Sequence, residues 1–383
     1  MKVLHLVGSQ TSEYYSNLSR LYAPGCLKSF PDLEHVILLA HLDGSWSLLL
    51  DADEHSLEAD ILDSVPKLSL AKALSILEEK NSKPDILQPH MFCYRGMTTF
   101  RSIADMLDIP ILGSAGSVMA LTTNKWQTRA VVASVGVPVP QAAMIKKEET
   151  PSQVLARISL PFLLKPARED NSMGISLVRE EKELVEALAT AFEFDDLVFA
   201  EQFIPLGREI RVGVVETENG KELEMLPAME YVLHQKKVPI RTSLDKLTPT
   251  DAKEGLAFTP VDRICPAPVS DKLRSKLKDL ATKAHHALDC QHYSLYDVRV
   301  DPDENPYFIE ASPYCSFSPK SAIVCMGAPL YDDRALFLRL AKKAIDDFEA
   351  TTGTNAATSQ SLGMRKHRRN HSPNSVLANE STA

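Results

Sequence analysis

Short apolar runs alternate with amphipathic segments through the first 113 residues of the chain. Four runs have the length of buried strands, and two of the segments between them repeat apolar residues at helical spacing. The expected strands are Val3–Val7, Val36–Leu39, Asp85–Leu87 and Ile109–Leu112, and the expected helices are Ser69–Lys80 and Thr98–Leu107. Strands that alternate with helices predict a parallel, doubly wound sheet and an α/β fold class.

The middle of the chain favours strands joined by polar connections. A well-capped helix is predicted from Thr123, and Gly136 ends it. The elements expected next are strands Phe162–Lys165 and Gly174–Val178 around a polar loop, a helix near Glu180–Phe192, and strands Leu197–Phe203 and Glu209–Val215. The long segment Pro227–Pro268 is poorly patterned, which indicates a mobile substrate loop rather than part of the sheet.

Two further helices are predicted near the C-terminus. Ser270 caps the first, whose single apolar stripe is Leu273, Leu277, Leu280, Ala284 and Leu288. The second covers Asp332–Phe348. The Thr/Ser/Asn-rich sequence beyond it is typical of a disordered tail.

Composition narrows the class of protein. A chain of 383 residues with 44% hydrophobic and 24% charged residues can form two or three lobes of a soluble globular protein. No apolar run approaches the roughly 20 residues that span a bilayer, so we expect no membrane association. The N-terminus has no signal-peptide profile, and six scattered cysteines without a CxxC pair indicate reduced thiols and a cytoplasmic location. A net charge of −9 argues against a nucleic-acid partner.

The most informative stretch is Leu295–Ser312, where two β-prone runs flank a Pro/Asp/Glu/Asn cluster and predict a hairpin. If its turn is centred on Asp303–Glu304, Asp297 and Glu310 lie opposite each other with Cβ atoms about 5 Å apart. Two such carboxylates repel each other unless they share a cation. A turn shifted by one residue would place them on opposite faces instead. Both residues lie among apolar neighbours, where unpaired charge is costly, and this favours the metal interpretation.

Two other segments carry candidate ligand groups. The loop Arg168–Gly174 follows Lys165 and could turn backbone N–H groups towards an anion. The segment Glu201–Glu209 reads as strand, turn and strand, and could present backbone groups to a base and a carboxylate to a ribose. Taken singly, each also fits an ordinary hairpin loop or β-turn, and Lys125 near a helix start fits a solvated lysine.

The order of these features resembles the ATP-grasp superfamily, and within it the D-alanine–D-alanine ligase branch, over roughly residues 1–345. The resemblance implies an N-terminal preATP-grasp α/β domain followed by an ATP-grasp module of two lobes. The expected boundaries are residues 1–114 for the N-terminal domain, 115–198 for the lid subdomain, 199–349 for the catalytic subdomain and 350–383 for the tail.

The same resemblance implies ATP and Mg²⁺, with Mn²⁺ as an alternative ion, and a set of site residues. The family's two phosphate-binding lysines correspond to Lys125 and Lys165, and its lid over the phosphates corresponds to Glu169–Gly174, which includes Asn171 and Ser172. The segment that binds adenine corresponds to Glu201, Gln202, Phe203 and Ile204. The residue that binds the ribose corresponds to Glu209. The family's three metal ligands correspond to Asp297, Glu310 and Ser312, and Ser312 replaces an asparagine of the family. Ser321 corresponds to a serine that binds the carboxylate of the incoming amino acid.

Departures from the family concern the first substrate. The glutamate that helps to hold the ammonium of D-alanine corresponds to Tyr15, and a second acidic motif corresponds to Cys93–Phe100, which has no carboxylate. The arginine that supports the transition-state oxyanion corresponds to Leu295. Local misalignment in divergent loops is the alternative explanation. The residues gained instead, Tyr14, Tyr15, Phe92, Tyr94 and Arg95, suit a larger, flatter and anionic acceptor.

The segment Met91–Thr98 resembles the ligases of mycosporine-like amino acid biosynthesis, which join an amino acid to mycosporine-glycine, an acceptor without an α-ammonium group, and the departures above fit that branch. We therefore expect an ATP-dependent carbon–nitrogen ligase that phosphorylates an acceptor oxygen and lets an amine displace phosphate. Arg211, two residues along the strand from Glu209, could supply the charge lost at Leu295 and is expected to act in catalysis with Lys165. Arg241 and Lys246 are further candidates for phosphate or substrate contact. A dipeptide ligase and a non-catalytic nucleotide-binding protein are the competing interpretations.

Three other features have ordinary explanations. His285 and His286 lack partners at helical spacing, Arg365–Arg369 is read as a solubilising tract, and Cys315 has no triad around it. The expected partners are a small-molecule acceptor and an amino acid. A homodimer is one assembly compatible with the sequence, which does not fix the oligomeric state.

Overall fold

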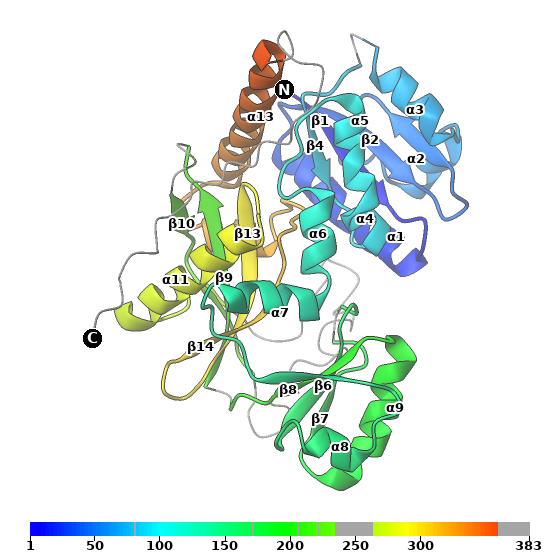
Figure 1. Cartoon of the computed structure of the whole chain (residues 1–383). Helices are drawn as coiled ribbons and strands as arrows, with labels where there is room; N and C mark the ends of the chain where they lie inside the picture. The colour runs from blue at the N-terminus through cyan, green and yellow to red at the C-terminus, as the bar shows by residue number, and fades with distance from the viewer. Residues whose placement is uncertain are drawn as a thin grey trace. The chain divides into compact units, whose positions relative to one another are not determined.

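The computed structural model describes residues 1–79, 82–170, 172–205, 207–218, 220, 222–233 and 263–358, with side chains up to residue 352 (Figure 1). Residues Met1–Ile345 form one compact unit, and Asp346–Ala383 belong to a second. None of the helices in the described ranges is long and apolar enough to cross a membrane.

The first sheet has the strand order β3-β2-β1-β4. Its strands are β1 (Lys2–Gly8), β2 (Glu34–Ala40), β3 (Trp46–Leu49) and β4 (Ile86–Pro89). β1 runs parallel to β2 and to β4, as the alternation of strands and helices predicted. The sequence analysis missed the antiparallel edge strand β3. The strand expected at Ile109–Leu112 contributes only an isolated bridge between Leu87 and Ile111.

Helices follow these strands and cover the sheet with apolar side chains. They are α1 (Glu13–Ser29), α2 (Ala59–Ser64), α3 (Leu70–Leu77), α4 (Tyr94–Met97), the 3-10 helix η1 (Thr99–Ser102) and α5 (Ile103–Leu107). One core cluster joins Leu4 and Leu6 of β1 to Leu77 of α3 and Ile103 of α5. The helix expected at Thr98–Leu107 is thus present as two shorter pieces.

The second sheet is antiparallel and has the order β5-β8-β6-β7. It consists of β5 (Ala142–Ile145), β6 (Phe162–Pro166), β7 (Ser176–Val178) and β8 (Val198–Gln202). The associated helices are α8 (Pro151–Leu155), η2 (Glu181–Glu183) and α9 (Leu184–Phe194). Leu184, Ala187 and Ala191 of α9 are buried in the core of this sheet. The two strands predicted on either side of the polar loop and the helix predicted after them are confirmed.

The third sheet follows the order β12-β11-β9-β13-β14, and β10 also pairs with β9. Its strands are β9 (Arg208–Glu216), β10 (Leu223–Met225), β11 (Met229–Tyr231), β12 (Arg263–Ile264), β13 (Tyr293–Val300) and β14 (Pro306–Ala311). The expectation that Pro227–Pro268 stays outside the sheet is wrong at both ends, because β11 and β12 pair with each other. Residues 234–262 lie outside the described residues.

Helices with clear apolar faces pack on this sheet. They are α6 (Gly116–Thr122), α7 (Lys125–Ser134), α11 (Asp271–Ala287), α12 (Ala322–Gly327) and α13 (Asp333–Thr358). The Ser270 hydroxyl accepts the Leu273 N–H and caps α11 at 3.1 Å, as predicted. The entire predicted stripe of this helix is buried, from Leu273 to Leu288.

Candidate functional site

A cavity of about 780 Å³, counted with the space at its mouth, lies between the second and third sheets. Most of the nucleotide and metal candidates named from the sequence line it: Lys125, Lys165, Ser172, Glu201, Gln202, Phe203, Ile204, Glu209, Asp297 and Glu310. Folding therefore brings together residues that are up to 185 positions apart in the chain (125 to 310).

The hairpin of β13 and β14 places Asp297 directly opposite Glu310, as predicted, but by an unexpected route. Near the tip, the pairs Val300–Pro306 and Val298–Phe308 set a register that would bring Ile309 opposite Asp297. A β-bulge between Asp297 and Val298 leaves Ile309 as an extra residue and shifts the register by one. Both carboxylates consequently face the cavity, although the turn is not centred where the sequence analysis assumed.

Arg211 lies opposite Asp297 on the other neighbouring strand, β9. Its Nε and Nη2 atoms donate to the two carboxylate oxygens at 2.6 and 2.8 Å. Burial opposes the charged form, but Asp297 outweighs it and holds the pKa of Arg211 well above its usual range. This two-pronged contact orients Asp297 and partly offsets its charge. The charge that the sequence analysis expected from Arg211 is thus present beside the carboxylate pair.

Two lysines approach the cavity from different elements. Lys165 on β6 forms a buried ion pair with Glu201 on the adjacent strand β8; their side chains are 6% and 4% exposed. Lys125 is the first residue of α7, which Asn124 caps by accepting the Gln127 N–H. The Lys125 ammonium donates to the Glu169 carbonyl and lies 3.8 Å from Glu310.

Arg299 is a pocket residue that the sequence analysis missed. Its Nη1 atom donates to Glu209 at 3.1 Å, and its Nε atom donates to the Ile204 carbonyl at 3.3 Å. The guanidinium also lies over the ring of Phe203, 5.4 Å from the ring centre. One side chain therefore ties the predicted ribose carboxylate to the predicted adenine segment. Its place two residues after Asp297 in a strand with alternating faces could have revealed it.

The polar loop after β6 is anchored at its base. The Arg168 backbone N–H donates to Asp195 at 2.8 Å, and the Arg168 guanidinium pairs with the same carboxylate. Gly174 has φ of +68°, and a Cβ atom there would lie 2.7 Å from Pro166 and 2.8 Å from Phe194. Glycine is required at this return point, which keeps Ser172 at the cavity wall.

Among the described candidates, Ser312, Ser321, Tyr15 and Arg95 lie outside the lining of the cavity. Ser312 is buried just beyond β14, and its backbone N–H bonds the Leu295 carbonyl at 2.8 Å. Ser321 precedes α12, and its hydroxyl accepts a weak bond from the Cys315 thiol at 3.3 Å. Arg95 is exposed and lies over Phe100, so the structure does not bring its guanidinium to the cavity. Asn171, Arg241 and Lys246 lie outside the described residues.

Three aromatic side chains from different parts of the chain lie next to one another outside the lining of the cavity. Phe92 lies 5.4 Å from Tyr22 and 6.1 Å from Tyr314 between ring centres. Asp170, and then burial and Glu310, raise the pKa of Tyr314 well above its usual range, which places this phenol beside the acidic groups. Burial, and then Asp170, raise the pKa of Tyr15. Tyr15 and Phe92 were candidates from the sequence, whereas Tyr22 and Tyr314 were not.

This arrangement has the elements of a site for a polyanion with a divalent cation. Two hard carboxylates on one face of a hairpin are the ligands that Mg²⁺ prefers, and they fit such an ion. Lys125 at the start of α7 and Lys165 on β6, together with the arginines of the neighbouring strands, can neutralise phosphate groups. Apolar side chains complete the wall and exclude water, namely Pro140, Leu163, Ile175, Val298 and Ile309.

Comparison with known sequences places this site within a recognised family. Residues 131–328, more than half of the chain, match the family model described as D-ala D-ala ligase C-terminus. The chain is 28% identical over 214 residues to the D-alanine–D-alanine ligase of Geobacter sulfurreducens, a match that covers 56% of this chain and 62% of that protein. It is 30% identical over 211 residues to the enzyme of the same name from Syntrophobacter fumaroxidans, covering 54% and 62%. The chain thus spans less than two thirds of these relatives.

Solved structures share the fold over nearly the full chain. The D-alanine–D-alanine ligase of Coxiella burnetii superposes with a TM-score of 0.76 at 18% identity, and the match covers 94% of this chain and 98% of that one. The VanG D-Ala:D-Ser ligase of Enterococcus faecalis gives 0.72 at 20% identity and covers 90% and 99%. The predicted α/β fold of ATP-grasp type is therefore confirmed.

Proposed function

Because the chain belongs to the D-ala D-ala ligase C-terminus family, we propose that it is an ATP-dependent carbon–nitrogen ligase that forms ADP. The observation that carries this proposal is the pair Asp297 and Glu310, opposed across a bulged hairpin and facing a cavity that Lys125 and Lys165 also line. The family uses ATP with Mg²⁺. The three successive sheets support a boundary near residue 114 and a second one after β8 (Val198–Gln202) rather than at residue 198, and α13 (Asp333–Thr358) continues through the boundary expected at residue 349.

In the proposed complex, adenine lies against Glu201–Ile204, and Glu209 binds the ribose. Lys125 and Lys165 neutralise the phosphates, each through charge-assisted hydrogen bonds worth about 1.5–3 kcal/mol. Asp297 and Glu310 would hold the magnesium ion, with Ser312 as a weaker ligand reached directly or through water. The ion, when bound, supplies charge neutralisation at the phosphate oxygens.

The chain's own groups then position the reactants. The γ-phosphoryl group passes to an oxygen of the acceptor, an amine attacks the activated carbon, and phosphate leaves, giving ADP, inorganic phosphate and a new C–N bond. Arg211 is fixed beside Asp297 and can stabilise negative charge where the family's arginine is replaced by Leu295. Catalysis of this kind depends on placement and charge more than on a general base.

For the acceptor, we propose mycosporine-glycine, coupled to a small polar L-amino acid. Tyr15 and Cys93–Phe100 offer no carboxylate for the ammonium of a D-alanine, and an unpaired buried cation is costly. The rings of Tyr22, Phe92 and Tyr314 lie next to one another and provide flat apolar surface outside the lining of the cavity. Such surface favours a cyclic conjugated acceptor without an α-ammonium group.

A phosphate-release screen tests this proposal. Purified protein is incubated with Mg²⁺ and ATP and a panel of amino acids, with and without mycosporine-glycine. We expect ADP release with serine or threonine only when mycosporine-glycine is present, together with an imine-linked product of red-shifted ultraviolet absorbance. Ser321→Ala should weaken the apparent affinity for the amino acid more than that for ATP.

The second candidate is a dipeptide ligase that uses D-alanine, as its relatives' names state. Efficient formation of D-alanyl-D-alanine in the same screen would replace the mycosporine proposal with this one. Absence of turnover with every acceptor, combined with retained ATP binding, would instead indicate a non-catalytic nucleotide-binding protein, for which Leu295 and Ser312 are the supporting residues.

A further inference from the structure

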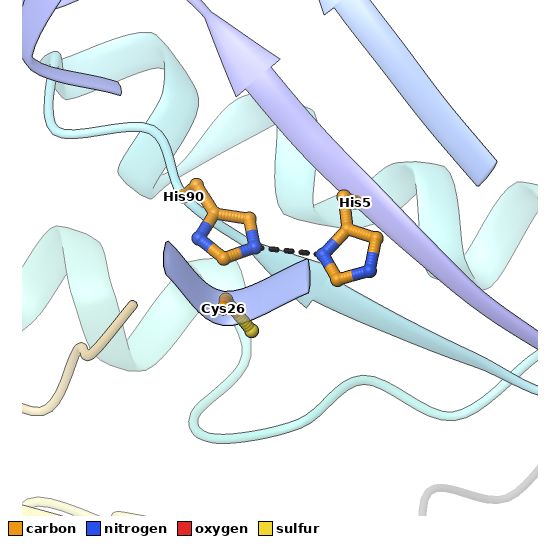
Figure 2. A group of neighbouring side chains, drawn as sticks. All are labelled: His5, Cys26 and His90. Carbon is orange, nitrogen blue, oxygen red and sulfur yellow. Dashed lines mark hydrogen bonds between the residues drawn. The ribbon is translucent and has the colours of Figure 1, made fainter. Parts of the chain in front are cut away.

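A second cluster of chemically active side chains lies in the interior of the first sheet, apart from the proposed ligase site. His5 on β1, Cys26 on α1 and His90 just after β4 each offer one ligand atom, and these three atoms lie within 4.8 Å of one another. His5 and Cys26 are fully buried, and His90 is 1% exposed. Figure 2 shows the two imidazole rings joined by a hydrogen bond with Cys26 beside them.

Hydrogen bonds determine which ring nitrogens carry protons. His35 Nε2 lies 2.9 Å from the Phe30 carbonyl, which can only accept, so the proton is on Nε2 and Nδ1 of His35 is bare. His5 Nε2 must then donate to His35 Nδ1 at 2.9 Å, which leaves His5 Nδ1 bare. His90 Nε2 donates to that atom at 2.8 Å. A carbonyl at one end therefore fixes the neutral tautomer of all three histidines.

This chain of hydrogen bonds ends at a buried atom without a donor. His90 Nδ1 is bare by the same reasoning, and it has no hydrogen-bond partner among the described residues. Most buried polar atoms in native structures have such a partner, so this lone pair leaves the hydrogen bonding of the cluster incomplete and can accept the Nε2 proton of the same ring. In the described part of the chain, no hydrogen bond or ion pair links a carboxylate to His5, Cys26 or His90.

We propose that His5, Cys26 and His90 form a buried site for a soft monovalent metal ion, Cu⁺. Two imidazoles and a thiolate are a donor set that copper and zinc both accept, and thiolate favours soft ions. Charge selects between them. The Cys26 thiol releases its proton to solvent on binding, so a monovalent ion gives a neutral complex, whereas Zn²⁺ would leave a net positive charge in an apolar interior.

Metal binding requires a small local change. The ligand atoms are His5 Nδ1 and His90 Nε2, so the proton on His90 Nε2 moves to the bare Nδ1 of the same ring when the ion binds. Two nitrogen ligands held about 2.0 Å from one ion lie about 3.3–3.5 Å apart, so the His5 Nδ1–His90 Nε2 contact of 2.8 Å must open by about 0.6 Å. His5 keeps its Nε2 proton on His35, and this outer hydrogen bond fixes the ring so that Nδ1 points at the ion. His35 is therefore a positioning residue of the site.

The experiment uses the full-length protein, reduced and free of oxygen, titrated with Cu⁺ against a chromophoric Cu⁺ chelator. We expect one equivalent per chain that outcompetes the chelator, and at least about a 100-fold loss of affinity in Cys26→Ala and in His90→Gln. Cys93→Ala is the matched control, since Cys93 is another buried cysteine of the same sheet region and should retain the equivalent. Cys265→Ala/Cys325→Ala, which removes two thiols elsewhere, should also retain it.

X-ray absorption at the copper edge of the wild-type protein keeps the test independent of how well the variants fold. We expect one sulfur and two imidazole nitrogens around the ion. Failure to bind Cu⁺, a sulfur-only shell, or an unchanged equivalent in Cys26→Ala would overturn the site. Equally tight Zn²⁺ binding at the same residues would overturn the charge argument and with it the choice of copper. Ligase turnover enters none of these measurements.

Discussion

The cavity between the second and third sheets and the histidine–cysteine cluster of His5, Cys26 and His90 both bury polar groups, but they do so in opposite ways. The cavity pairs full charges across neighbouring strands, as in Arg211–Asp297 and Lys165–Glu201. The cluster instead keeps its histidines neutral in a chain of hydrogen bonds that runs from the Phe30 carbonyl to the unpaired Nδ1 of His90. Ion pairs suit a binding site in which a charged ligand can replace one partner of each pair. A neutral chain of hydrogen bonds suits a buried site whose surroundings tolerate little added charge.

The largest effect is expected from removing one carboxylate of the opposed pair. Glu310→Gln leaves the hairpin intact but removes the charge that the metal requires, so turnover should fall at least about 1,000-fold. Affinity for nucleotide with Mg²⁺ should fall far more than affinity for nucleotide alone. Asp303→Asn, on the exposed tip of the same hairpin, is the control and should be near wild type. Phosphate release by Glu310→Gln at near wild-type rate would rule out the metal assignment.

The pair Arg211–Asp297 tests whether a bound ion can replace the guanidinium as the partner of Asp297. Arg211→Met leaves Asp297 with less compensation in a mostly buried position, and the free energy of unfolding without ligand should fall by about 3–5 kcal/mol. Saturating Mg²⁺ and ATP should recover part of this loss, because the ion can take the place of the guanidinium. Denaturant titrations with and without ligand measure both values. An identical loss under the two conditions would show that Arg211 has a purely structural role.

Substitution of Lys165 is expected to affect both ATP binding and the stability of the fold. Lys165→Met should raise the ATP dissociation constant at least about tenfold, since charge-assisted bonds of about 1.5–3 kcal/mol are lost. It should also lower stability, because Glu201 stays buried at 3% exposure without this cation. Lys147→Met at an exposed turn should change neither property. Similar small effects of both substitutions on ATP affinity would show that the Arg168–Gly174 loop is an ordinary hairpin connection with no role in phosphate binding.

The neutral chain should respond to mutation in a different way. His35→Leu leaves His5 Nε2 and the Phe30 carbonyl without their partner and should lower the free energy of unfolding by about 1–3 kcal/mol. The ATP dissociation constant should stay within about twofold of wild type, since the histidine–cysteine cluster does not line the cavity. A large change in ATP affinity would contradict the separation of the two regions.

The smallest effect concerns the anchor of the polar loop and depends on pH. Burial raises the pKa of Asp195, but hydrogen bonds from Arg168 and from the Leu197 and Arg168 backbone N–H groups outweigh it and lower the pKa to about 2. The stabilisation is therefore complete above the ordinary value of 3.8 and is lost as the pH falls from there towards 2. Asp195→Asn should cost about 1 kcal/mol at pH 7 and flatten the pH dependence of unfolding over this interval. An equally steep dependence in the variant would exclude Asp195 as its source.

Local chemistry explains what could be predicted from the sequence. The Ser270 cap and the stripe from Leu273 to Leu288 specify α11 because both depend only on residues a few positions apart. The alternation around Asp297 and Glu310 specifies two strands and a hairpin for the same reason. Family resemblance then supplied the order of the nucleotide and metal candidates, which the structure brings to one cavity.

Tertiary structure decided register and distant pairing. The chain pattern could not reveal that Ile309 is an extra residue in a bulge, yet this single position determines whether the two carboxylates share a face. Nor could it reveal that Arg211 meets Asp297 from 86 residues away, or that His5, Cys26 and His90 converge. The sequence by itself therefore determined which elements form and which charges they carry. Packing of strands and helices that are distant in the chain decided which of those groups meet, because such contacts depend on register and burial rather than on local propensity.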